Sequence, residues 1–384
     1  MAGVKAVICH QGELSVADVP DPRPARGQIL LDVVRCGICG SDLHARRHSD
    51  ELADVAAELG LDTVIRPDHR VVFGHEILGR VREYGEGTSR RWRPGSLVVA
   101  LPVVRTDGDV HMTGFEEAAP GGLAEQVVVQ EAYTFPVPDG VAEDLAAFTE
   151  PLAVAWHAVR RGQVKGRSAV VVGCGPIGLA VILMLKAAGV RTVVASDLSA
   201  ARRALAQRCG ADTVVDPRET SPYDAHRQRG VVTSLPAYLG FGIDAMRAAR
   251  RIPFLPWDRL MHAAEALGQG VQGPVVFECV GVPGILDEVI AGVPLRSRVV
   301  VVGVCMQPDT VRPAVAIHKE TELRFVFGYD PAEFAQTLRM IADGKVDPSP
   351  LHTGTVGLDG VAGAFEALGR PEEHAKILVD PGLS

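Results

Sequence analysis

Residues 168–189 read SAVVVGCGPIGLAVILMLKAAG, and no other segment of the chain predicts a local fold so clearly. The apolar run 169–172 is typical of a buried strand, and apolar residues then recur at helical spacing, at Ile177, Ala180, Val181, Met184, Leu185 and Ala188. Between strand and helix stands GxGxxG, whose glycines permit a tight turn, close approach to a pyrophosphate and close helix packing. The motif alone is weak, but this context strengthens it. We assign to a dinucleotide site Gly173, Gly175, Pro176, Ile177 and Gly178.

A second strand is predicted at 192–196 and ends at Asp197, nineteen residues after Gly178. An acid at about this distance accepts hydrogen bonds from the adenosine ribose and repels a 2′-phosphate, so the sequence favours NAD over NADP. Asp197 could also cap the following helix, and the two roles are compatible. The counterevidence is Arg202 and Arg203, because either guanidinium could bind a phosphate.

Strands and helices continue to alternate as far as residue 309. Apolar runs at 214–216, 275–278 and 299–302 predict further parallel strands, so the fold class is α/β with a Rossmann domain over residues 154–309. An extra segment at about 230–268 interrupts this pattern and carries aromatic residues and arginines. It could form a subunit contact or a lid, but we favour an amphipathic surface helix packed on its own domain.

A second group of reactive residues lies in CGICGSDLH, residues 36–44, and in GHE, residues 74–76. Thiolate and imidazole suit zinc, and a catalytic zinc keeps one position open. Cys36 and Cys39 could be half of a four-cysteine site, a redox dithiol, or a ligand beside a packed cysteine. The remaining cysteines are scattered singly and no thioredoxin-like unit follows, so we interpret Cys39 as a ligand and Cys36 as packing.

Together these motifs resemble the zinc-dependent alcohol dehydrogenase branch of the medium-chain dehydrogenase/reductase superfamily, over nearly the whole chain. The resemblance rests on six segments: 36–44, 74–81 (GHEILGRV), 121–129 (GGLAEQVVV), 150–159 (EPLAVAWHAV), 171–180 and 374–381 (HAKILVDP). It implies a β-rich, GroES-like catalytic domain formed by residues 1–153 and 310–384. No cysteine stands between Arg80 and Gly121, where many relatives have a structural zinc lobe, so we expect one zinc ion per chain.

The resemblance also implies a ligand set. Cys39 and His75 match the family's first two zinc ligands, and Glu150 stands where classical members have a second cysteine, as in polyol and threonine dehydrogenases. Glu76 matches an acid that can enter the zinc shell during exchange. Glu150 precedes Pro151 and could simply begin a helix. We favour ligation, because Cys39 and His75 alone would leave the zinc short of ligands.

Further roles carry over by position. Asp42 resembles the carboxylate that orients the imidazole of His75, and Ser41 and His44 match the proton relay. The resemblance implies a contact of Arg202 with the adenosine ribose or the edge of a phosphate, and a contact of Lys376 with the pyrophosphate. It implies backbone contacts to the nicotinamide carboxamide around Val302 and Val304.

Composition limits the partners. The chain has 384 residues, 47% of them hydrophobic, which is enough for two domains with cores of their own. Its net charge is −8 without a dense basic run, so nucleic acid is not an expected partner. The start, MAGVKAVICH, is not typical of a signal peptide, and no apolar stretch reaches transmembrane length. We expect a cytoplasmic homo-oligomer, a dimer or tetramer.

The predicted activity is zinc-dependent, NAD-linked interconversion of an alcohol and its carbonyl by hydride transfer. We expect a secondary alcohol, with a polyol or sugar as the alternative. Two other classes remain open: a zinc-free quinone or enoyl reductase of the same superfamily, and a nonenzymatic NAD-binding protein. The joint presence of Cys39, His75 and Glu150 argues against the zinc-free class.

Overall fold

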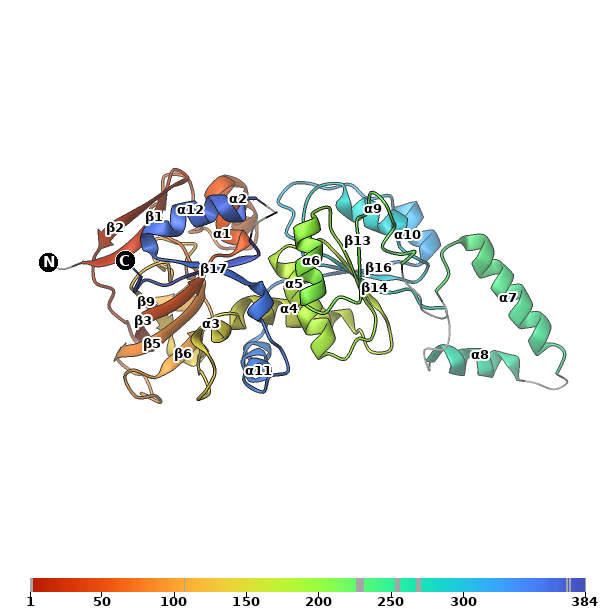
Figure 1. Cartoon of the computed structure of the whole chain (residues 1–384), viewed down its shortest axis with the longest axis horizontal. Helices are drawn as coiled ribbons and strands as arrows, with labels where there is room; N and C mark the ends of the chain where they lie inside the picture. Colours follow the sequence, from red (N-terminus) through yellow and green to blue (C-terminus); the bar gives the residue numbers. More distant parts are fainter. Residues whose placement is uncertain are drawn as a thin grey trace. The chain divides into compact units, whose positions relative to one another are not determined.

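The computed structural model describes residues 3–106, 108–225, 231–252, 256–266, 271–370, 372 and 374–383. The chain divides into two compact units: unit 1 comprises Met1–Trp156 and Gly328–Ser384, and unit 2 comprises His157–Phe327. Figure 1 shows their elements in sequence colours, with the C-terminal segment (blue) inside the unit that the N-terminal segment (red) begins. Residues far apart in sequence can therefore share one site in unit 1.

Unit 1 is built on a seven-stranded sheet in which β3 (Gln28–Gly37) is central. The path is β10-β6-β5-β3-β18-β17, with β9 also paired to β3. The other strands of this sheet are β5 (Glu76–Tyr84), β6 (Leu97–Ala100), β9 (Gln126–Gln130), β10 (Thr134–Pro136), β17 (His352–Val356) and β18 (Lys376–Val379). Strand β18 runs antiparallel to β3 and pairs Val379 with Cys36. This pairing brings the end of the chain to the start of CGICGSDLH.

Smaller elements complete unit 1. The remaining strands are β1 (Val4–His10), β2 (Glu13–Val19), β4 (Val71–Val72), β7 (Val103–Thr106) and β8 (Asp109–Met112). The helices are α1 (Gly40–Arg47), α2 (Ser49–Glu58), α3 (Glu143–Ala146), α11 (Pro331–Ala342) and α12 (Val361–Leu368), with short turns η1 (Glu131–Tyr133), η2 (Ser349–Leu351) and η3 (Leu358–Gly360). Helix α11 begins at a capping box in which Asp330 accepts from the amide of Glu333, and Pro331 takes the first helical position.

Unit 2 contains a six-stranded sheet in the order β13-β12-β11-β14-β15-β16, and every pair in it is parallel. The strands are β11 (Ala169–Val172), β12 (Val193–Ser196), β13 (Thr213–Val215), β14 (Val275–Glu278), β15 (Arg298–Val301) and β16 (Glu322–Phe325). This order is that of the Rossmann fold, so the predicted fold class is confirmed. Valines dominate the central strands because a parallel sheet is buried on both faces.

Four helices of unit 2 alternate in sequence with the strands of this sheet. They are α5 (Pro176–Ala187), α6 (Ala200–Arg208), α9 (Ile285–Gly292) and α10 (Pro313–Lys319), and α4 (Thr149–Gly162) continues into the unit from unit 1. Helix α5 packs on β11 and β12, and α6 packs on β12 and β13 (Figure 1). Strand β16 lies beyond residue 309, where the sequence predicted the domain to end. As an edge strand it carries Glu322 and Arg324, so it lacks the apolar run by which the inner strands were found.

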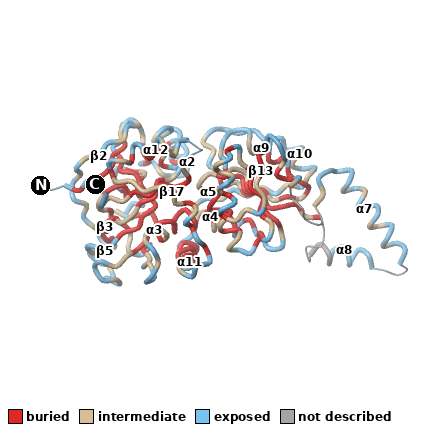
Figure 2. Tube along the Cα trace, viewed as in Figure 1, coloured by how far each residue is buried: buried red, intermediate tan, exposed pale blue. Residues whose placement is uncertain are grey.

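The extra segment forms α7 (Leu235–Ala249) and α8 (Trp257–Ala266), while residues 230, 253–255 and 267–268 lie outside the described residues. The sequence favoured a helix packed on its own domain, but α7 has no buried residue. Figure 2 shows no buried stretch along the parts of the two helices whose burial is described. Large apolar side chains are exposed on both, namely Leu235, Leu239, Phe241, Ile243, Trp257, Leu260 and Met261. Within the described residues, no helix is long and apolar enough to cross a bilayer.

Candidate metal centre

The metal centre begins where β3 ends and α1 starts. Cys39 is the N-cap residue of α1, with extended backbone angles. Its amide donates to Oδ2 of Asp42 over 2.8 Å. The other oxygen of Asp42, Oδ1, lies 3.1 Å from Nδ1 of His75. The fully buried carboxylate of Asp42 therefore fixes the backbone of one predicted ligand and the ring of another.

His75 and Glu76 enter from β5. Glu76 starts this strand and pairs with Gly37, the last residue of β3. A Cβ atom on Gly37 would lie only 1.9 Å from Oε2 of Glu76. By contrast, a Cβ atom on Gly40, the second glycine of CGICG, would have no atom within 4 Å. Gly37 therefore leaves the space that the Glu76 carboxylate occupies.

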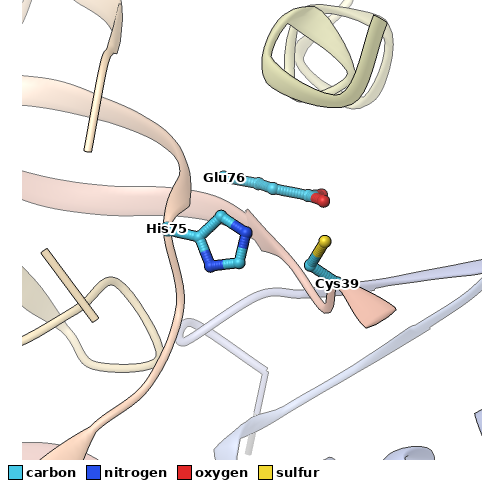
Figure 3. A group of neighbouring side chains, drawn as sticks. All are labelled: Cys39, His75 and Glu76. Atoms are coloured by element: carbon cyan, nitrogen blue, oxygen red, sulfur yellow. The ribbon is translucent and has the colours of Figure 1, made fainter. Parts of the chain in front are cut away.

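Cys39, His75 and Glu76 converge in Figure 3. One potential ligand atom of each lies within 4.8 Å of the other two, and this is the one such cluster found among the described residues. Oε2 of Glu76 is buried and has no hydrogen-bond partner. A buried carboxylate oxygen without a donor is costly unless a cation satisfies it. Thiolate, imidazole and carboxylate are the donors that zinc takes in proteins, so these residues fit a zinc ion.

The electrostatics of the cluster favour positive charge. Burial alone would lower the pKa of His75, but the charges of Asp42 and Cys39 outweigh it and hold that pKa well above its ordinary value. Burial likewise disfavours the charged form of Lys376, and Glu76 and Cys39 outweigh it, so the Lys376 pKa is raised. Two cationic side chains are thus stabilised beside the anionic donors. The same donors would attract a bound metal cation.

Lys376 comes from β18 and is buried. Its Nζ lies 2.5 Å from Oε1 of Glu76 and 3.0 Å from the carbonyl oxygen of Ile38. The pyrophosphate contact that the resemblance implied for this lysine stays a prediction. Sequence reasoning missed the pair, because nothing in either motif links two residues 300 positions apart.

Glu150 lies near the start of α4 and is 7% exposed. Its Oε1 accepts a hydrogen bond of 2.8 Å from the hydroxyl of Tyr329. Burial, reinforced by the charge of Glu76, raises the pKa of Glu150 to about 7. Glu150 is not in the cluster of Cys39, His75 and Glu76, so here Glu76 is the carboxylate nearest to ligand position. Ligation by Glu150 stays a prediction.

The two predicted relay residues are placed differently. Ser41 is exposed, and its Oγ lies 3.3 Å from Nε2 of His75. His44 lies on the exposed side of α1, with its ring centroid 6.4 Å from that of His48. Partial burial, followed by the charges of His48 and Arg47, lowers the pKa of His44. The structure thus brings Ser41 to the metal centre, whereas His44 faces outward.

Unit 2 holds the predicted cofactor residues. Gly173 has a φ of 90°, and a Cβ on Gly178 would lie 1.9 Å from the carbonyl oxygen of Gly173, so neither position tolerates a larger residue. A Cβ on Gly175 would meet only Nη1 of Arg202, at 4.0 Å. Open space in front of this turn fits a pyrophosphate at the N-terminus of α5, which begins with Pro176 and Ile177.

Asp197 follows β12 as predicted. Its Oδ2 accepts from the amide of Cys174 over 2.7 Å, and its Oδ1 accepts from the amide of Ser199 over 2.8 Å. The carboxylate is therefore held against the glycine turn. At the other predicted contact, the amide of Val302 donates to the carbonyl of Glu278, and Val304 is 60% exposed.

Comparisons with known proteins agree with both the predicted metal centre and the predicted cofactor domain. An alcohol dehydrogenase GroES-like domain matches residues 25–139, and a zinc-binding dehydrogenase domain matches residues 176–343. The chain is 31% identical over 389 positions to (R,R)-butanediol dehydrogenase of Bacillus subtilis (strain 168), which covers 98% of this chain and 100% of that protein. This chain belongs to the zinc-dependent alcohol dehydrogenases. The resemblance inferred from the motifs is confirmed.

Other relatives of this zinc-dependent alcohol dehydrogenase extend the likeness. Sorbitol dehydrogenase of Homo sapiens is 28% identical over 374 positions, covering 94% of this chain and 91% of that protein. The crystal structure of 2R,3R-butanediol dehydrogenase from Bacillus subtilis has a TM-score of 0.73 at 28% identity, over 99% of this chain and 100% of that one. Membership confirms an alcohol-oxidising enzyme that uses zinc and NAD(P), and not a zinc-free reductase or a nonenzymatic binding protein.

Proposed function

We propose that this alcohol dehydrogenase oxidises a secondary hydroxyl group that has a second hydroxyl beside it, with NAD as the hydride acceptor. The observation that carries the proposal is the cluster of Cys39, His75 and Glu76 with its unsatisfied carboxylate oxygen. The relatives named above are butanediol and sorbitol dehydrogenases. Butane-2,3-diol and sorbitol share a secondary hydroxyl with a hydroxylated neighbour. A longer polyol is the alternative substrate.

The side chains around the cluster would hold a zinc ion and keep one position free for the substrate. Cys39 and His75 are two ligands, and Glu76 or Glu150 supplies the carboxylate. Because Asp42 faces Nδ1 of His75, it holds the ring proton there and leaves the Nε2 lone pair for the metal. When bound, zinc supplies Lewis acidity toward the alcohol oxygen.

The substrate proton needs a route to solvent. Ser41 is exposed and its hydroxyl contacts the ligand face of His75, so it can accept the proton and pass it on. His44 stands three residues later on α1, at the surface, where an imidazole can exchange the proton with water.

NAD is favoured because Asp197 stands where the adenosine ribose is bound in Rossmann folds. Both of its oxygens already accept backbone amides and remain able to accept ribose hydroxyls, since each carboxylate oxygen has two lone pairs. A 2′-phosphate would meet this negative charge. Lys376 and Arg202 are proposed to contact the pyrophosphate and the ribose, and the backbone at Val302 and Val304 to contact the carboxamide.

We also propose a cellular location and an oligomeric state. All seven cysteines are free thiols, which fits the reducing cytoplasm. The homo-oligomer expected from the sequence remains a proposal, to be measured by light scattering.

The function is tested by metal analysis together with a substrate screen. Purified enzyme should hold about one zinc ion per chain. It should reduce NAD fastest with butane-2,3-diol or a short polyol, and more slowly with butan-2-ol and butan-1-ol. Chelation should remove activity and zinc should restore it. Full activity in zinc-free protein, or a preference for primary alcohols, would refute the proposal.

A further inference from the structure

Behind Asp197 lies a group of three charged side chains that the proposed chemistry does not use. Asp216, Arg203 and Arg218 form this group, here called the Asp216 clamp. Asp216 follows β13 and is buried, with 8% of its surface exposed. Its Oδ1 accepts a hydrogen bond of 2.9 Å from Nε of Arg218. Its Oδ2 accepts two hydrogen bonds, one of 2.5 Å from Nη2 of Arg218 and one of 3.1 Å from Nη1 of Arg203. One carboxylate thus orients two guanidinium groups.

The two arginines in turn hold the backbone that carries Asp197. Nη1 of Arg203 donates to the carbonyl oxygens of Asp197 and Leu198, over 2.8 and 2.9 Å. Nη2 of Arg218 donates to the carbonyl oxygen of Leu198 over 3.1 Å. The turn after β12 is therefore bound from behind by three hydrogen bonds from charged donors, which are stronger than neutral ones.

On its front, the same turn presents the Asp197 carboxylate to the glycine loop, through the amides of Cys174 and Ser199. A carboxylate is aimed only as well as the backbone beneath it is fixed. The clamp thus contacts the backbone of Asp197, the residue that faces the ribose in the proposed function. Arg218 forms hydrogen bonds that keep the pKa of Asp216 below its usual range, so the clamp stays charged at neutral pH.

The clamp also changes what Arg203 can do. Arg202 and Arg203 are the two arginines that could bind a 2′-phosphate at this position. Nη1 of Arg203 is already engaged by Asp216 and by two carbonyl oxygens, so this nitrogen is tied to the turn after β12. Arg202 lies toward the glycine turn, near Gly175. Loss of the Asp216 charge would release Arg203 as a second phosphate ligand.

We propose that Asp216 is a positioning residue for cofactor selectivity. It holds Arg203 and Arg218 on the carbonyls of Asp197 and Leu198, which aims the Asp197 carboxylate at the ribose hydroxyls and withholds Arg203 from a 2′-phosphate. The inference rests on the proposed function, in which Asp197 faces the ribose. Selectivity for NAD then depends on a residue that touches no part of the cofactor. Aiming Asp197 strengthens NAD binding, and withholding Arg203 weakens NADP binding, so both effects favour NAD.

The test compares Asp216→Asn with wild type by direct binding of NADH and NADPH, followed by nucleotide fluorescence. The ratio of NADPH to NADH dissociation constants should fall by roughly 3- to 30-fold, the range expected for indirect coupling through a hydrogen-bond network. NADH should bind more weakly and NADPH more tightly. The matched control is Asp212→Asn, because Asp212 precedes the same strand and pairs with Lys186 without touching the Asp197 turn.

Two further variants separate the effects. In Asp216→Asn/Arg203→Leu the gain in NADPH affinity should disappear, because the released guanidinium is gone. Should Asp216→Asn fail to fold, Arg203→Leu alone should weaken NADH binding without improving NADPH binding. An unchanged dissociation-constant ratio in folded Asp216→Asn, or unchanged NADH affinity in Arg203→Leu, overturns the inference and leaves NAD dependence intact. A wild-type preference for NADPH overturns both this inference and the proposed cofactor.

Discussion

The metal centre of unit 1 and the Asp197 region of unit 2 both depend on carboxylates, buried in the first and half-buried in the second, but the partners of these carboxylates differ. In the metal centre, Glu76 and Glu150 take their partners from 300 and 179 positions away, at Lys376 and Tyr329. Even then one oxygen of Glu76 has no donor. Asp197 is bonded on both oxygens by amides at most 23 positions away.

The first arrangement suits a site that binds a cation. The second suits a site that selects its ligand by geometry. An unsatisfied oxygen among a thiol and an imidazole leaves electron pairs for a metal ion. A carboxylate that accepts an amide on each oxygen has a fixed direction and can select among ligands by geometry. The two regions should therefore respond to mutation independently, and the largest effects should arise where the donors are incomplete.

The strongest test of that independence is Cys39→Ser. Loss of the thiolate should remove zinc and lower turnover by about 10³-fold or more, because several kcal/mol of transition-state stabilisation depend on the metal. NADH affinity should change by less than about threefold, since no cofactor residue is touched. Zinc content, turnover and NADH binding are measured on the same preparation. A parallel loss of NADH affinity would show that the two regions are not separable.

Lys376→Met should give the largest loss of stability. It leaves the Glu76 carboxylate buried without its cation, at a cost of about 3–5 kcal/mol in the metal-free protein. The cost should be smaller with zinc bound, because the metal supplies the missing positive charge. Urea unfolding with and without zinc measures both values. Lys345→Met is the control, since Lys345 is an exposed lysine paired with Asp343 in the same unit. Equal losses in both variants would contradict the role given to Lys376.

Glu150 predicts a pH effect in the metal-free protein. Its pKa is raised from 4.5 to about 7, mainly by burial, so the folded state holds this proton more tightly than the unfolded state does. The resulting stabilisation is complete below about pH 4.5 and is lost as pH rises to about 7. At 1.36 kcal/mol per unit the loss is about 3 kcal/mol. Glu150→Gln should remove this slope in denaturant titrations, and Glu58→Gln, at an exposed site, should not. A slope that persists in Glu150→Gln would assign it elsewhere.

Asp42→Asn should have the smallest effect of the four. The amide keeps the size of the side chain but removes the charge that orients His75, so zinc affinity should fall by about 10- to 100-fold. Competition with a chromophoric chelator measures the affinity. Asp50→Asn, which alters an exposed acid on α2, is the control. If both variants bind zinc as wild type does, Asp42 serves only to cap α1.

The same contrast explains what the sequence could predict. The strand at 275–278 and the glycine turn were located from local patterns alone, because strand, turn and helix follow one another directly. Asp197 was found by spacing for the same reason. The predicted ligands Cys39, His75 and Glu76 stand within two short motifs, so their convergence was also predictable.

Side-chain pairs between distant residues and the edge strand of the parallel sheet were not predictable. Neither the Lys376 pair with Glu76 nor the Tyr329 bond to Glu150 leaves a signal in either motif, because each forms only when distant strands or helices meet. Strand β16 was missed because half of its side chains are charged. The exposed faces of α7 and α8 were also missed, since an apolar helical stripe predicts burial and does not say against what. The Asp216 clamp could have been suspected, because Asp216 and Arg218 are neighbours in sequence.

The pairing of β18 with β3 has a consequence for biosynthesis. Protein chains emerge from the ribosome N-terminus first, and domains tend to fold as they become complete. Cys39, His75 and Glu76 are translated early, yet the lysine that neutralises Glu76 arrives only at position 376. The whole of unit 2 can fold in the interval. For most of its translation the nascent chain therefore lacks the lysine that faces Glu76, and a metal ion captured early would supply the positive charge in its place.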